Sequence, residues 1–145
     1  GSKLLVGSPF YSSDVNDPMK AKMGAAFYYS DFINASVVAA PTVFTTTTSG
    51  ALLGQNVKIV NTGILISVPG RDTLMGAVDY YTTANIAARR LSYRHVSASS
   101  VSNDQFGFGM AAENTASGVR VVVGSVTKSD PNTSSGAAFV HDVKQ

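Results

Sequence analysis

The chain has 145 residues, of which 44% are hydrophobic and 14% are charged, and its formal net charge is +2. This composition excludes a disordered chain, and the length is sufficient for one domain with a buried core. The slight positive charge does not indicate a nucleic-acid-binding protein. Cysteine is absent, which excludes a disulfide framework and thiol chemistry. No apolar run approaches the roughly 18 residues of a membrane-spanning helix.

Taken in chain order, short runs rich in β-branched and aromatic residues predict strands separated by Gly, Pro, Asp and Asn. The best helical candidate, residues 82–91, is short and lacks caps. Gly1-Ser2 resembles a cloning scar, and no signal-peptide pattern follows it. The segments expected to form strands are residues 3–8, 25–32, 36–44, 56–61, 63–68, 77–83, 91–96, 106–112, 119–125 and 137–142.

Two sequence markers recur three times in the same order. An apolar run that ends in small residues or proline occupies residues 4–9, 64–69 and 121–126. The second marker starts with Gly24, Gly76 or Gly136 and continues as a short apolar run. Such self-similarity predicts a repeat architecture, here three units of about 50–60 residues. The repeats span residues 3–44, 45–96 and 97–145 of one domain, residues 1–145.

The repeat length and the strand pattern predict an all-β fold made of β-propeller blades, each a four-stranded antiparallel sheet. With the strands of a blade named a to d, the first repeat supplies b to d, the second all four, and the third a to c. An array of this kind leaves unpaired edges, so we expect a homo-oligomer or a part of a larger propeller. A β-sandwich is the alternative fold, because regularly spaced short strands also suit it.

The motifs resemble the FG-GAP repeat of integrin α-chain propellers. Phe106-Gly107 corresponds to FG, residues 6–9 and 123–125 correspond to GAP, and the run from Gly136 corresponds to the closing strand. The second repeat matches less well, with Leu53-Gly54 and residues 67–69 at these places. The resemblance covers nearly the whole chain and implies a non-enzymatic interaction module in an extracellular or surface-associated protein.

Integrin-type repeats often carry a calcium loop, which requires several oxygen ligands. Here the corresponding residues, 113–118, contain the single carboxylate Glu113 and precede Arg120. The resemblance is therefore to the calcium-free type, and we expect neither a metal nor another cofactor.

Possible catalytic and nucleic-acid-binding groups are better explained as structural or surface residues. His95 and His141 are the only histidines, no nucleophile elbow accompanies them, and we expect ordinary surface histidines and no enzyme activity. Arg89, Arg90 and Arg94 form a basic cluster with His95, which we place on the c–d turn and the outer strand of the second repeat. A solvated edge is expected there, so nucleic acid is an unlikely partner.

The resemblance implies that the b–c and d–a loops share one face, which is the partner-binding face in integrins. On this face we expect a protein or glycan partner at a cell or virion surface. The alternatives are a structural subunit of a large assembly and the propeller domain of a hydrolase. The residues expected to contact the partner are Phe10, Tyr11, Asp14, Arg71, Asp72, Lys128 and Asp130.

Overall fold

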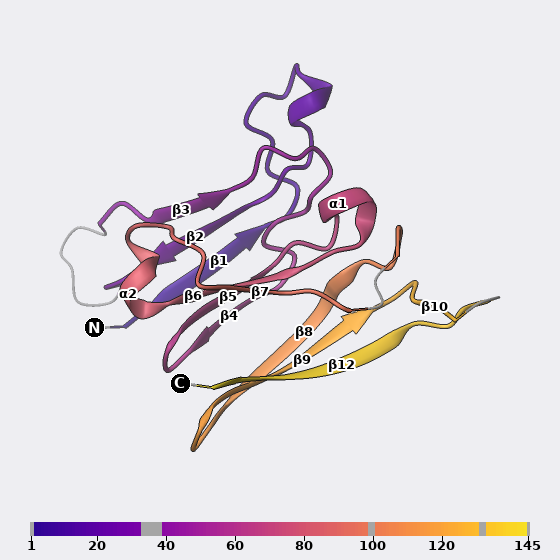
Figure 1. Ribbon diagram of the computed structural model, residues 1–145. Coiled ribbons are helices and arrows are strands. Elements are labelled where there is room, and N and C mark those ends of the chain that lie inside the picture. Colours follow the sequence, from indigo (N-terminus) through magenta and orange to yellow (C-terminus); the bar gives the residue numbers. More distant parts are fainter. Residues whose placement is uncertain (1, 33–38, 99–100, 131–132, 145) are drawn as a thin grey trace.

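The chain folds into three antiparallel β-sheets (Figure 1). The computed structural model describes residues 2–32, 39–98, 101–130 and 133–144, called the described residues from here on. The all-β prediction is confirmed, and no sheet closes on itself within the described residues. Short helical turns occur in three connections of the described chain: η1 (Pro18–Lys20), α1 (Arg71–Leu74) and α2 (Thr83–Ile86). Among the described residues, no helix is long and apolar enough to cross a membrane.

The three sheets follow the chain in order. Sheet 1 contains β1 (Leu4–Ser8), β2 (Ala25–Tyr29) and β3 (Thr42–Thr45). Sheet 2 contains β4 (Val57–Val60), β5 (Gly63–Ser67), β6 (Val78–Thr82) and β7 (Tyr93–His95). Sheet 3 contains β8 (Phe106–Thr115), β9 (Gly118–Ser125) and β12 (Ala137–Lys144), and β10 (Ser129–Asp130) and β11 (Thr133–Ser134) form a small separate ladder.

The strand positions agree with the prediction to within a few residues. Sheets of three, four and three strands match the expected contents of the three repeats. The strand expected over residues 36–44 is shorter, since β3 begins at Thr42, and residues 36–38 lie outside the described residues. Within 82–91, only Thr83–Ile86 forms a helix of one turn.

The strand register is the same at corresponding positions of the three sheets. Gly7 pairs with Ala26, Ser67 with Val78, and Gly124 with Ala138, as the alignment of the two markers requires. The glycines that open the second marker also share one conformation, with φ of +85° at Gly24, +83° at Gly76 and +73° at Gly136. Residues with side chains rarely adopt this conformation, which explains glycine at all three positions.

Consecutive sheets are joined by the same hydrogen bond, which we call the clasp. The Leu53 amide donates to the Met23 carbonyl at 3.1 Å, and the Phe106 amide donates to the Met75 carbonyl at 3.0 Å. Beside these bonds, Gly24 bridges to Leu53 and Gly76 to Phe106. A Cβ atom on either glycine would meet the carbonyl oxygen of Leu53 or Phe106 at 2.2 Å, so the close approach itself requires glycine.

Two apolar clusters hold the sheets together. One lies between sheets 1 and 2 and includes Tyr28, Phe44, Ile64, Ile66 and Tyr81. The other lies between sheets 2 and 3 and includes Leu65, Tyr80, Phe106, Val121 and Val123. Each fully buried aliphatic side chain stabilises the fold by about 1.5–3 kcal/mol. Because β5 is in the middle of the stack, its alternate residues serve both clusters, and it is buried throughout.

The connections between the first two strands of sheets 2 and 3 are tight hairpins. Asn61 and Thr62 link β4 to β5, and Ala116 and Ser117 link β8 to β9. The Asn61 amide donates to the Asn114 side-chain oxygen at 2.8 Å, which holds the two hairpins side by side. The region compared above with a calcium loop is therefore mostly paired strand.

Candidate functional site

Five loops lie at one end of the sheets, and we call this end of the molecule the loop face (Figure 1). It comprises residues 9–24, 46–56, 68–77, 96–105 and 126–136, apart from those outside the described residues. The Ser49 hydroxyl donates to the carbonyls of Pro18 and Ala21 at 3.2 and 3.1 Å. Further along, the Gly70 amide donates to Ala51 at 2.9 Å and the Asn103 amide to Thr73 at 3.1 Å. These hydrogen bonds link successive loops, and those of Ser49 and Asn103 join loops of different repeats.

Loop 9–24 is the longest and is ordered by its own polar side chains. The Asp14 carboxylate accepts the Asn16 amide at 3.0 Å, and the Asp17 carboxylate caps η1 by accepting the Met19 amide at 2.9 Å. Lys20 lies 3.4 Å from the Asp17 carboxylate and 3.9 Å from that of Asp14. The carboxylates therefore stabilise the turn, and Asp14, expected to contact a partner, is engaged within the loop.

The ordered loop exposes large apolar side chains. Phe10, Val15 and Met19 are 67%, 87% and 74% exposed. Tyr11 is less exposed, and its ring packs edge-on against Phe27 with centroids 6.4 Å apart. Phe10 and Tyr11 were predicted from sequence. Val15 and Met19 were missed, although an apolar residue within a run of Asp and Asn was a usable signal.

Arg71 and Asp72 lie on a strained turn of the loop face. Asp72, Thr73 and Leu74 have φ of 50°, 57° and 66°, a left-handed run that costs about 1–3 kcal/mol per residue. Loop 96–105 holds this turn, because the Ser102 hydroxyl donates to the Thr73 carbonyl at 2.9 Å. The Arg71 guanidinium binds the exposed Asp72 carboxylate at 3.2 Å, so the two predicted contact residues form one charged pair.

Lys128 is engaged in a structural contact and does not point freely into solvent. Its ammonium lies 3.0 Å from the carboxylate of Asp104, whose side chain is 1% exposed. The same carboxylate accepts the Val101 amide at 2.8 Å, and the Thr127 hydroxyl donates to the Asn103 carbonyl. Lys128 therefore anchors loop 96–105. Asp130 lies in β10, which places its backbone at the edge of the loop face.

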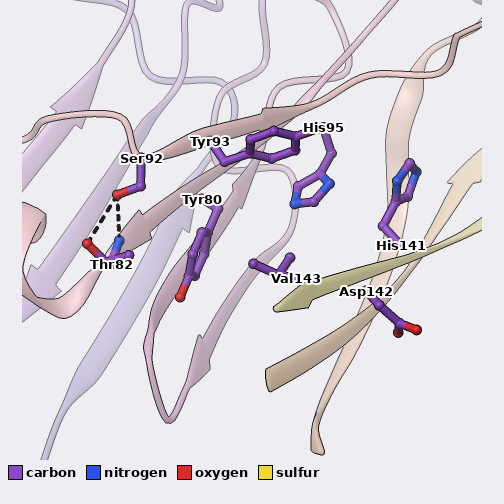
Figure 2. A pocket seen from close by; sticks show the side chains of 8 residues that line it. All are labelled: Tyr80, Thr82, Ser92, Tyr93, His95, His141, Asp142 and Val143. Carbon is purple, nitrogen blue, oxygen red and sulfur yellow. Dashed lines mark hydrogen bonds between the residues drawn. The ribbon is translucent and has the colours of Figure 1, made fainter. Parts of the chain in front are cut away.

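The two histidines face each other across the junction of sheets 2 and 3, so the expectation of surface histidines is wrong for His95, which is buried, whereas His141 is partly exposed. Figure 2 shows both beside a pocket of about 380 Å³ that Tyr80, Tyr93 and Val143 also line. Their rings are 5.0 Å apart, His95 is 4% exposed, and neither Nε2 atom has a hydrogen-bond partner among the described residues. Burial, and secondarily His141, lowers the pKa of His95 from 6.5 to about 4, although Asp79 opposes this.

The other polar groups near this pocket are engaged in structural contacts. The Ser92 hydroxyl accepts the Thr82 amide at 2.9 Å and the Asn85 side chain at 2.8 Å, on the side of the pocket away from the histidines (Figure 2). The arrangement places a serine and two histidines in one pocket without joining them by a hydrogen bond.

The expected basic cluster is divided by the fold. Its position is confirmed, since Arg89 and Arg90 lie between β6 and β7 and Arg94 lies in β7. Arg94 binds the buried Asp79 carboxylate through two hydrogen bonds of 2.5 and 2.8 Å, and His95 faces inward. Only Arg89 and Arg90 remain as a solvated pair.

Comparisons with known proteins do not extend these observations. No family model matches the chain, and no curated protein matches it either.

Proposed function

We propose that the chain is a non-enzymatic interaction module whose three sheets are consecutive blades of a propeller of FG-GAP type. The equivalent register of the sheets and the repeated clasp support this finer description of the fold. In this proposal the loop face binds a protein partner at a cell or virion surface, and the sheets provide a rigid support.

The observation that carries the proposal is the exposure of Phe10, Val15 and Met19 on an ordered loop. Large apolar side chains gathered at one exposed place are typical of interaction surfaces. Asp17 and Lys20 hold the loop in place, so binding would cost little conformational entropy. The three side chains offer no hydrogen-bonding groups for sugar hydroxyls, which favours a protein partner over a glycan.

A partner-independent test uses a displayed library of random peptides selected on the wild-type chain. We expect most selected peptides to lose binding to the Phe10→Ser/Val15→Ser/Met19→Ser variant. Tyr93→Ser is the matched control, because Tyr93 is 58% exposed and lies in β7, outside the loop face. All these side chains are exposed, so the unfolding temperature of each variant should stay close to that of the wild type. Peptides that bind the triple variant as tightly as the wild type would contradict the proposal.

A further inference from the structure

The outer face of sheet 3 is equivalent to the face of sheet 2 that sheet 3 covers. Val122 pairs with Val140 in sheet 3, just as Leu65 pairs with Tyr80 in sheet 2. Leu65 and Tyr80 are 0% and 4% exposed because sheet 3 covers them. Val122 and Val140 are 40% and 62% exposed. We call this surface the C-terminal face, comprising Val122, Ala138 and Val140.

The outer face of sheet 1 is equivalent to the face of sheet 2 that packs against sheet 1. Its outer face consists of two cross-strand pairs, Leu4 with Tyr29 and Val6 with Phe27, and we call it the N-terminal face. Leu4, Val6 and Tyr29 have equivalents in sheet 2. These are Ile64, Ile66 and Tyr81, and they are buried against sheet 1. Val6 by contrast is 43% exposed.

We infer that the C-terminal face of one copy binds the N-terminal face of a second copy. The chain already builds this contact twice, between sheets 1 and 2 and between sheets 2 and 3. A third contact of the same kind would continue this series of interfaces. It would use the apolar C-terminal and N-terminal faces. Because the two faces differ, the contact is head-to-tail and either closes into a ring or extends as a filament.

Charge does not oppose the contact. Arg120 and Asp142 lie on the same side of sheet 3 as Val122 and form two hydrogen bonds of 2.8 and 3.0 Å with each other. Their opposite charges cancel, and Glu113, which pairs with Arg120 from β8, leaves a single negative charge at the rim of the C-terminal face. The central residues are valine and alanine, which match the aromatic and aliphatic residues of the N-terminal face.

The test is complementation between two variants, followed by light scattering on a size-exclusion column. We expect the wild type to give at least twice the 15.1 kDa chain mass. Val140→Lys and Val6→Lys should each give 15.1 kDa alone, since each places a charge in every head-to-tail contact. An equimolar mixture should restore a species of twice the chain mass, because each variant keeps the face that the other lacks. Val96→Lys, at similar exposure away from both faces, should behave as the wild type.

The mixture separates loss of the contact from loss of the fold, since unfolded chains could not restore association. A wild-type chain that remains at 15.1 kDa at the highest soluble concentration would overturn the inference. Single variants that still associate, or a mixture that stays monomeric while the wild type does not, would also overturn it. Peptide binding at the loop face involves other residues and would be unaffected by any of these results.

Discussion

His95 and His141 occupy the places at the second sheet junction that Phe44 and Tyr81 occupy at the first. The rings of Phe44 and Tyr81 are 4.7 Å apart, and those of the two histidines are 5.0 Å apart. Strand register makes the pairs equivalent, since Phe44 pairs with Ala26 and His95 pairs with Val78. Two histidines thus stand at the second junction where the first junction has a phenylalanine and a tyrosine.

His95 should make stability depend on pH. The pKa of His95 is lowered from 6.5 to about 4 in the folded state, mainly by burial. The unfolded chain therefore binds more protons between these values, and stability falls as the pH falls from about 6.5 to 4. The expected loss in the free energy of unfolding is on the order of 2–3 kcal/mol. Urea denaturation over this pH range measures it.

The control is the variant His95→Phe/His141→Tyr, which recreates the apolar pair of the first junction. Its stability should vary less with pH over the same range, because the remaining carboxylates are unchanged. An identical pH dependence in the wild type and the variant would show that His95 does not take up a proton on unfolding.

Two glycines with similar φ should respond differently to alanine. Gly50 has φ +70° with nothing within 4 Å of a Cβ atom, whereas Gly76 has φ +83° and the Phe106 carbonyl oxygen at 2.2 Å. Gly50→Ala should cost about 1–2 kcal/mol through backbone strain alone. Gly76→Ala must also open the clasp, so we expect a clearly larger loss of stability in thermal unfolding. Equal losses would mean that the clasp contributes little.

Two cross-strand Arg–Asp pairs with the same geometry should contribute differently to the stability of the fold. Arg94 binds Asp79, whose side chain is 5% exposed, while Arg120 binds the half-exposed Asp142. Arg94→Ala leaves a buried carboxylate without its partner and should cost about 3 kcal/mol or more. Arg120→Ala should change stability little, because water screens that pair. Chemical denaturation of both variants compares them directly, and a larger loss at Arg120 would contradict this assignment.

Lys128 should behave as a structural residue and Phe10 as a surface residue. Lys128→Met removes the cation beside the buried Asp104 carboxylate and should cost about 3 kcal/mol. Phe10→Ser should change stability by about 0.5 kcal/mol or less, since the side chain is largely exposed. Equilibrium unfolding in urea measures both. If Lys128→Met were as stable as the wild type, Lys128 would return to the set of possible partner contacts.

Much of the fold could be predicted because its signals are local. Apolar runs and turn residues placed most strands, and the recurring glycines placed Gly24, Gly76 and Gly136 at equivalent turns. The repeats also predicted which strands each sheet contains. These signals depend on short stretches of chain and on steric limits of the backbone, so they can be read without knowing the tertiary contacts.

The side-chain environments could not be predicted in the same way. His95 is buried because sheet 3 packs over it, and Lys128 is engaged because Asp104 lies across the junction of two loops. Both facts depend on contacts between segments more than 20 residues apart. Val15 and Met19 were missed for a different reason, since the exposure of an apolar side chain in a loop depends on how that loop folds.

The measurement that most directly tests the three-repeat architecture is a nuclear Overhauser spectrum of the isotopically labelled chain. The clasps predict contacts between the amide proton of Leu53 and residues Met23 and Gly24, and matching contacts between Phe106 and residues Met75 and Gly76. Both sets should be present with similar intensity, since the two junctions are equivalent. If either set were absent and Leu53 or Phe106 instead contacted a strand of a non-adjacent repeat, the ordered stack of three sheets would be wrong.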